Sequence, residues 1–353
     1  MTRTSEAFVR NRHLTLFALV VFIAPALLAQ ADRADIFIKD EMLRQNIPGL
    51  SLVVLKEGQI VKTAGYGVAN INLKMPATPE TIYKIASVST QFIATGIMLL
   101  VQEGQVGLND PVRKYLQRSP DAWRPITIRH LLTHTSGLMR DAPGFDPSKF
   151  LLDAELLKTA YSLPLRFAPG DRWEYSNLGY FILAEVIRKV SDRHWVEYLT
   201  EKVFKPSGMT ATYPTNTGLS LPNRALGYSD NHKLLVAADW RALRPAGAFL
   251  STVADLAKWD AALYTDKILT DASRGQMWSP VRLNNGTPHP YGFGWALSTF
   301  RDRRLVYHSG GVPGFRAQFA RLVDDKLTII VLMNLDDVDP DVIVRGLTAI
   351  YLP

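Results

Sequence analysis

The stretch Tyr83-Lys84-Ile85-Ala86-Ser87-Val88-Ser89-Thr90-Gln91-Phe92 decides how the rest of the chain is interpreted. It runs into residues 93–101, which are apolar on every side of a helix and end before Gly104. A helix without a polar face packs inside a domain, so we expect this one to be buried. Ser87 lies at its start, where unpaired backbone N–H groups and the positive end of the macrodipole stabilise negative charge. On this stretch alone Ser87 is either a nucleophile or an N-cap, and the N-cap is the commoner use of serine.

The composition is that of a globular protein. The chain has 353 residues, 47% of them hydrophobic and 21% charged, which is enough for a large core and two subdomains. Its net charge of +7 is spread along the chain without a block of Lys or Arg, so we expect no nucleic-acid partner. The absence of cysteine excludes disulfides and an anchor through a lipidated cysteine. The oligomeric state stays open.

The N-terminus is typical of an export signal. Basic residues between Arg3 and Arg12 precede an apolar run over residues 14–28, and Ala29-Gln30-Ala31 offers small residues for cleavage. A retained membrane anchor is the alternative; it is disfavoured because the run is shorter than about 20 residues and Pro25 interrupts it. We expect a signal peptide over residues 1–31, cleavage near Ala31, and a periplasmic or extracellular protein.

Periodicity predicts an α+β fold. Residues 32–45 are helical in pattern, and β-rich runs over 50–55 and 59–67 flank a hairpin turn at Glu57-Gly58. Near the C-terminus, β-rich runs over 305–308, 316–323 and 327–334 precede a helix over 341–351. Between these two groups, helices are predicted over 93–103, 128–132, 178–190, 195–203 and 254–264. The early hairpin and the late strands therefore form one antiparallel sheet flanked by the N- and C-terminal helices.

The same order divides residues 32–353 into two parts. The α/β part covers about 32–86 and 266–353, and an inserted all-helical subdomain covers about 87–265. We expect a pocket at the boundary between them, where Ser87 lies.

Two further stretches bear on Ser87. Tyr175 and Asn177 lie two residues apart just before a helix, so their side chains can point the same way; the plainer interpretation is a buried tyrosine and an asparagine N-cap. The stretch Tyr307-His308-Ser309-Gly310-Gly311 is a strand ending in glycines, where a backbone can approach a ligand closely.

With these motifs the chain resembles the class C β-lactamase-like serine hydrolases, which include penicillin-binding DD-peptidases, D-aminopeptidases and β-lactamase-fold esterases. The resemblance is carried by Gly107-Leu108-Asn109-Asp110-Pro111-Val112, by the run from His130 to Leu138, and by Tyr291-Gly292-Phe293-Gly294-Trp295. Each motif alone is weak, but all of them occur in the family's order over nearly the whole mature chain. The family's fold agrees with the one that periodicity predicts.

The resemblance implies a set of roles. Ser87 would be the nucleophile that forms an acyl-enzyme, and Tyr175 would accept its proton. Asn177 would hydrogen-bond oxygens of an amide or ester substrate. His308-Ser309-Gly310 stands where the family has Lys-Thr-Gly, and the N–H of Gly311 with that of Ser87 would form the oxyanion hole. No cofactor and no metal are implied.

Thr90 departs from the family pattern, which is Ser-x-x-Lys. Losing a positioned acid–base group costs about 10²–10⁴-fold in rate, so we expect reduced activity. Lys84 could replace the lysine, but it precedes the helix and is expected to point to solvent. His308 is better placed, and a half-charged imidazole with a pKa near ~6.5 would bind a β-lactam carboxylate weakly, which favours an ester or peptide substrate.

Two rival interpretations remain. His130 and His134, at i and i+4, would share a helical face as zinc ligands do, but no glutamate lies between them and no third ligand follows. The second rival is a binding protein. With Thr90 in place of the family lysine, the chain would be catalytically weak or inactive and would bind peptidoglycan or D-amino-acid peptide fragments. The preferred interpretation is an exported serine hydrolase for an ester, amide or β-lactam bond.

Overall fold

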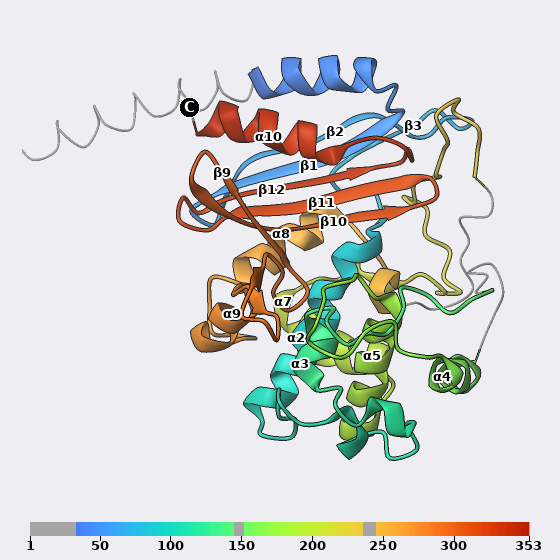
Figure 1. The fold of residues 1–353 in the computed structure, drawn as a ribbon. Coiled ribbons are helices and arrows are strands. Elements are labelled where there is room, and N and C mark those ends of the chain that lie inside the picture. The colour runs from blue at the N-terminus through green and yellow to red at the C-terminus, as the bar shows by residue number, and fades with distance from the viewer. Residues whose placement is uncertain (1–32, 145–151, 236–244, 353) are drawn as a thin grey trace, which may run out of the picture.

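The computed structural model describes residues 33–144, 152–235 and 245–352. Within them a seven-stranded antiparallel sheet carries helices on both faces (Figure 1). In spatial order the strands are β3 (Met75–Pro76), β2 (Gln59–Asn70), β1 (Gly49–Lys56), β12 (Leu327–Met333), β11 (Phe315–Leu322), β10 (Arg303–Val312) and β9 (Ala296–Phe300). The predicted fold class is confirmed. The predicted signal peptide lies outside the described residues and stays a prediction, as do the boundaries of the two parts.

At the centre of the sheet, a strand from the N-terminal part of the chain pairs with a strand from the C-terminal part. Strand β1 pairs with β2 through a tight turn, in which Glu57 and Gly58 both have positive φ, as a two-residue hairpin requires. On its other side β1 pairs with β12, with Leu50 opposite Met333. The predicted hairpin and late strands are therefore confirmed. Strands β3 and β9, which the pattern did not predict, extend the two edges.

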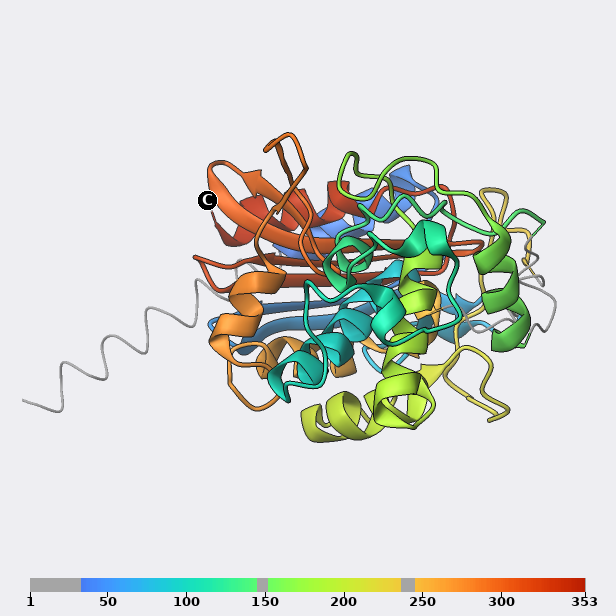
Figure 2. The same ribbon diagram turned by 60° about the horizontal axis from the view of Figure 1, so that its bottom comes forward.

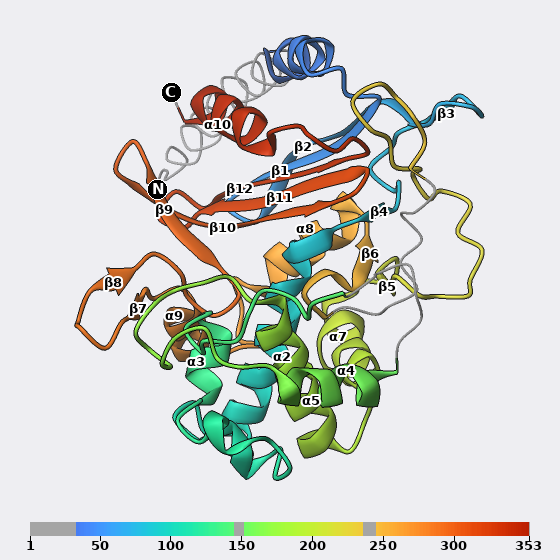
Figure 3. The same ribbon diagram turned by 45° about the vertical axis from the view of Figure 1, so that its right-hand side comes forward.

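Two helices cover the outer face of the sheet. The N-terminal helix (residues 33–44) and α10 (Pro340–Tyr351) lie over it side by side (Figures 1 and 3). Asp339 caps α10 and Pro340 occupies its first turn, where a missing N–H costs nothing. Between helices and sheet lies one apolar core that includes Ile38, Leu52, Ile329 and Leu347.

The helical part covers the inner face. Its α-helices are α2 (Thr90–Gln102), α3 (Ile128–Leu132), α4 (Asp153–Ser162), α5 (Asn177–Ser191), α6 (Trp195–Leu199), α7 (Lys205–Ser207), α8 (Val253–Ala262) and α9 (Asp271–Met277). A π-helical turn, η4 (Thr200–Phe204), joins α6 to α7, and short 3₁₀ turns are η1 (Ala86–Ser89), η2 (Val112–Lys114), η3 (Asp121–Trp123) and η6 (Pro245–Gly247). Small sheets add β4 (Tyr83–Lys84), β6 (Phe249–Ser251) and β5 (Tyr213–Pro214), and β7 (Val281–Arg282) with β8 (Pro288–His289). No helix among the described residues has the length and apolar character needed to cross a membrane.

Helix α2 runs through the middle of this part, as predicted from its apolar sequence. Its residues from Thr90 to Leu100 are buried. A Cβ atom at Gly96 would lie 2.9 Å from the Ile187 side chain, so α2 and α5 approach closely, and Figure 2 shows these cyan and yellow-green helices against each other. Because α2 is held on all sides, the residues at its start are held too.

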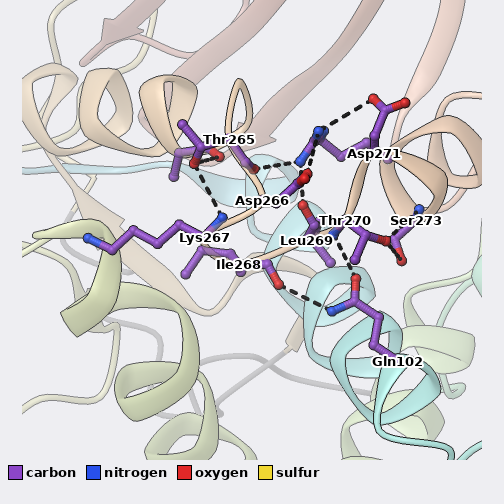
Figure 4. Close-up of polar contacts among 11 residues, drawn as sticks. Gln102, Thr265, Asp266, Lys267, Ile268, Leu269, Thr270, Asp271 and Ser273 are labelled. Atoms are coloured by element: carbon purple, nitrogen blue, oxygen red, sulfur yellow. Dashed lines mark hydrogen bonds and ion pairs between the residues drawn. The ribbon is translucent and has the colours of Figure 1, made fainter.

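The far end of α2 is tied to the loop between α8 and α9 (Figure 4). The Gln102 amide donates to the Ile268 carbonyl at 3.3 Å and accepts from the Thr270 N–H at 2.9 Å. In the same loop Thr270 caps α9 through the Ser273 N–H. Both ends of the buried helix are therefore fixed to other elements.

A buried ion pair joins the helical part to the sheet. The Arg321 guanidinium on β11 donates to Asp260 on α8 at 2.8 Å, and Thr328 on β12 donates to the same carboxylate at 2.9 Å. Both charged side chains are fully buried, and Arg321 also lies between the rings of Tyr264 and Trp278, at 4.7 and 4.9 Å. Burial raises the pKa of Asp260, and Arg321 acts in the opposite direction. The carboxylate thus depends on this one guanidinium.

We expect Arg321→Met to lower the free energy of unfolding by about 3–5 kcal/mol, because it leaves a buried carboxylate without its cation. Urea denaturation measures the loss. The matched control is Arg304→Met, which breaks the exposed pair with Asp324 and should cost no more than about 1 kcal/mol. Equal losses in the two variants would contradict this account of the pair.

Candidate active site

Ser87 lies in η1, between β4 and the start of α2. Its predecessor Ala86 has φ +48°, a left-handed conformation that is costly for alanine. The N-cap of α2 is Ser89, and its side chain makes no capping bond. The hydroxyl of Ser87 is therefore not the cap of α2, and the side chain is half-buried at the wall of a cleft.

Strand β10 passes directly beside η1. A Cβ atom at Gly310 would lie 2.3 Å from the Ile85 carbonyl oxygen and 3.1 Å from the Ser87 backbone nitrogen. Only a glycine permits this approach, which brings the C-terminal sheet against the serine. The contact places His308, two residues earlier on the same face of β10, near Ser87.

The cleft has a volume of about 980 Å³. The predicted residues that line it are Ser87, Tyr175, His308, Ser309, Gly310 and Gly311. Asn177 lines a smaller adjoining pocket of about 130 Å³, to which Ser87 and Gly311 also contribute. The structure thus brings the predicted site residues together, and Thr90 lies beneath them, fully buried.

Tyr175 presents its phenol to Ser87. Burial raises the pKa of Tyr175 to about 12, and the neighbouring Ser87 hydroxyl and Arg140 guanidinium act in the opposite direction. The guanidinium of Arg140 lies 5.1 Å from the centre of the phenol ring. The hydroxyl itself is buried and makes no hydrogen bond to any described residue. A buried phenol beside a serine hydroxyl is the arrangement in which a proton can pass between the two.

Asn177 is the first residue of α5 and not its cap. Ser176 is the N-cap, and its hydroxyl accepts from the Gly179 N–H at 2.9 Å, so the predicted asparagine cap is wrong. The Asn177 amide instead donates to Asp141 at 2.9 Å. Because a carboxylate only accepts, this bond turns the amide nitrogen toward Asp141 and fixes the orientation of the side chain.

Thr90 cannot supply the missing base. Its hydroxyl donates to the Ser87 carbonyl at 2.8 Å and also lies 3.4 Å from the Gly294 carbonyl. Lys84 was expected to point to solvent, and this is wrong: its side chain is buried in β4, because the strand is covered where it pairs with β6. Lys84 is also absent from the described lining of the cleft.

His308 is neutral rather than half-charged. Burial lowers the pKa of His308 to about 4, so the expected value near ~6.5 is corrected by desolvation of the ring. Its Nδ1 lies 2.7 Å from the Ser309 carbonyl oxygen and its Nε2 lies 2.9 Å from the Tyr291 hydroxyl. His308 therefore brings no positive charge to the cleft at neutral pH.

His130 and His134 do not share a face as metal ligands. The His130 Nδ1 accepts from the Thr127 N–H in a capping box at the start of α3. His134 follows the helix with φ +59°, and its ring bonds the Ser176 N–H and the Tyr291 hydroxyl. Within residues 33–144, 152–235 and 245–352, no group of three His, Cys, Asp or Glu is arranged to hold a metal ion.

Sequence reasoning missed four residues of the site: Arg140, Trp173, His134 and Tyr291. The indole of Trp173 lines the cleft and stacks on His289, with 4.4 Å between ring centres. Its alternation with Tyr175 could have revealed it, since residues two apart in an extended segment face the same way. His134 and Tyr291 stood in motifs that were recognised, but nothing local showed that they meet.

Comparisons with known proteins agree with this geometry. The family model described as Beta-lactamase matches residues 32–349. Penicillin-binding protein 4* of Bacillus subtilis is 33% identical, over 81% of this chain and 68% of its own length. Protein flp of Staphylococcus aureus is 28% identical, over 86% of this chain and 62% of its own length. The chain thus spans about two thirds of the length of these relatives.

Solved structures show the same fold. The octameric penicillin-binding protein homologue from Pyrococcus abyssi superposes with a TM-score of 0.77 at 28% identity, covering 91% of this chain and 76% of that one. D-amino acid amidase from Ochrobactrum anthropi SV3, complexed with L-phenylalanine, gives a TM-score of 0.77 at 24% identity and covers 93% of this chain and 99% of that one.

We expect Gly310→Ala to abolish reaction at Ser87, because the new methyl group would collide with the Ile85 carbonyl and push β10 away from η1. Labelling of Ser87 by a fluorophosphonate checks this. Gly275→Ala is the control: its Cβ meets nothing within 4 Å, and in α9 it should stabilise the fold by up to ~1 kcal/mol. Normal labelling of Gly310→Ala would show that the close approach is not required.

Proposed function

The chain belongs to the β-lactamase family, whose members are serine hydrolases, and from this premise we propose that it is an exported hydrolase working through an acyl-enzyme on Ser87. One observation carries the proposal. The Ser87 hydroxyl and the buried Tyr175 phenol face each other at the wall of the cleft, beside the glycines of β10. A nucleophile, a proton acceptor and a nearby backbone are the parts that acyl transfer needs.

In the proposed reaction, the Ser87 oxygen bonds to the substrate carbonyl carbon while its proton leaves toward Tyr175. The carbonyl oxygen becomes negative, and the N–H groups of Ser87 and Gly311 would stabilise it. Collapse of the intermediate expels the leaving group, which takes up the proton. Water then cleaves the acyl-serine by the reverse arrangement, and Asn177 would hold the substrate amide or ester group throughout.

The site lacks a strong base, because Tyr175 is almost entirely protonated at neutral pH. With a pKa near 12, about one Tyr175 in 10⁵ is phenolate at pH 7, against about one in 10³ for an ordinary tyrosine. An ammonium group would favour the phenolate, but Thr90 brings only a hydroxyl, which is engaged by the Ser87 carbonyl. We therefore propose that turnover is reduced by this threonine.

The proposed substrate class rests on His308, which stands where the family has a lysine. A neutral His308 cannot pair with the carboxylate of a β-lactam as a lysine would. We propose an ester or peptide substrate, with a cell-wall peptide as one candidate. The apolar run near the N-terminus supports export through cleavage near Ala31.

A second candidate function is a binding protein for peptidoglycan or D-amino-acid peptide fragments. The observation that favours it is the high pKa of Tyr175 together with Thr90, since both slow the chemical step and leave the cleft intact. The two candidates differ in whether Ser87 turns substrate over.

Hydrolysis of p-nitrophenyl esters tests the proposed function. We expect wild-type protein to give a slow, saturable rate and Ser87→Ala to give only the background rate, because the nucleophile is gone. Ser162→Ala, at an exposed serine ending α4, should keep the wild-type rate. Equal rates in wild type and Ser87→Ala would leave only the binding protein.

Restoring the lysine tests the role of Thr90. We expect Thr90→Lys to speed acylation about 10²-fold or more, because a buried amine is a positioned base and favours the Tyr175 phenolate. The rate is measured as labelling by a fluorescent penicillin or a phosphonate. Thr90→Met has similar length without basicity and should give no gain. A gain that is equal in both variants would point to packing and not to the amine.

A further inference from the structure

Arg316 lies at the start of β11 and lines the cleft that holds Ser87. In the sheet it is the direct partner of Gly311 on β10. Side chains that are directly opposite in an antiparallel pair lie on the same face of the sheet, and the faces alternate along a strand. Arg316 is therefore on the same face as Gly311, and His308 is on the opposite one.

Both faces of β10 reach the same cleft because this strand has an open edge. Strand β9 pairs with β10 only over Arg303–Tyr307. Beyond Tyr307, no strand of the described sheet pairs with that side of β10. The cleft runs from Ser87 around this edge to Arg316, so a substrate held at Ser87 can extend to the guanidinium.

The guanidinium of Arg316 is held by the turn between β10 and β11. Its Nη1 donates to the Val312 carbonyl at 3.3 Å and to the Phe315 carbonyl at 3.1 Å. A Cβ atom at Gly311 would lie 3.2 Å from Nη1, 3.3 Å from Cζ and 3.4 Å from Nε, so the guanidinium lies against this glycine. Backbone atoms thus fix the place of the cation.

The other edge of this guanidinium has no partner in the part of the chain that the structure describes. The printed bonds of Arg316 use Nη1, and its Nε and Nη2 donate to none of the described residues. Arg304 uses the same two nitrogens to hold the Asp324 carboxylate, at 2.9 and 2.6 Å. Arg188 holds Glu185 in the same way. The remaining edge of Arg316 is therefore the fork with which arginine binds a carboxylate.

The carboxylates near this fork are engaged elsewhere. Three of them line the cleft beside α10, and these are Asp336, Asp339 and Asp341. They accept from the Gly314 N–H, from the N–H of residue 341, and from the Gln318 amide together with Arg345, respectively. Their charges lower the positive potential at a distance, so an anion is held by direct contact with the fork. A carboxylate that pairs with Arg316 is thus not one of the described residues.

We propose that Arg316 binds a carboxylate of the substrate and so selects esters or peptides that carry one. The inference rests on the proposed function, since the substrate is the molecule whose carbonyl reacts with Ser87. Arg316 supplies, on the other face of β10, the cation that His308 does not supply. Of the other two arginines that line the cleft, Arg345 is held in an ion pair and Arg140 lies over an aromatic ring.

Two matched pairs of esters test the proposal. On the acyl side, mono-p-nitrophenyl adipate carries a carboxylate and p-nitrophenyl hexanoate does not. On the leaving-group side, meta-acetoxybenzoate carries one and phenyl acetate does not. We expect Arg316→Gln to lower the ratio of kcat/KM for the charged ester to that for its neutral match about 10–100-fold in one pair or both, mainly through KM, because a charge-assisted contact is lost. Arg316→Lys should recover only part of this ratio, since an ammonium group offers no fork.

Arg304→Gln is the matched control, because Arg304 is an exposed arginine on β10 that does not line the cleft. Its ratios should equal those of the wild type. Unchanged ratios in both pairs for Arg316→Gln would overturn the proposal. An equal loss for charged and neutral esters would also overturn it, since Arg316 would then only support Gly311. Circular dichroism confirms that each variant is folded.

Binding to Ser87→Ala separates this inference from the proposed function, because it needs no turnover. We expect calorimetric titration with mono-p-nitrophenyl adipate or meta-acetoxybenzoate to show binding about tenfold weaker when Arg316→Gln is added. If Ser87→Ala hydrolyses the esters as fast as wild type, the proposed function fails, and the titration still decides whether Arg316 holds the carboxylate. If Ser87→Ala is inactive and the double variant binds both acids as tightly as the single one, the inference about Arg316 alone is wrong.

Discussion

The structure depends on the close contact between Gly310 on β10 and the backbone of Ile85 to Ser87. This contact joins the last part of the chain to the first, since β10 belongs to the C-terminal sheet and η1 opens the buried helix α2. No side chain fits between the two backbones, so the distance is set by backbone atoms and does not vary with rotamers. The proposed chemistry of the cleft requires Ser87 to lie directly against this strand.

The rest of the fold holds that contact in place from both sides. Helix α2 is buried along its length and fixed at its far end by Gln102, and the sheet is tied to α8 by the buried pair of Arg321 and Asp260. The charge pair is costly to bury, because its attraction repays the desolvation of the two ions only when its geometry is good. They make the boundary between sheet and helical part rigid, which is what a site built from both parts requires.

The electrostatics of the site differ from those expected for a lysine-dependent hydrolase. Burial keeps His308 neutral and Tyr175 protonated at neutral pH, and the one cation against the phenol ring, within the described residues, is Arg140. Tyr175 and His308, beside Ser87, are therefore neutral side chains and not an ion pair. Neutral side chains suit a buried region, where an unpaired ion is expensive.

The sequence by itself determined the fold class, the central hairpin and the buried helix, because periodicity and turn residues are local properties. The set of residues around Ser87 came from the resemblance of the motifs to those of a known family. The same resemblance showed that Thr90 stands where a lysine is expected. Tertiary structure alone decided that Lys84 is buried, that His308 is neutral and that Tyr291 meets His134, 157 positions away. Desolvation and long-range hydrogen bonds depend on what surrounds a side chain, and no local pattern carries that information.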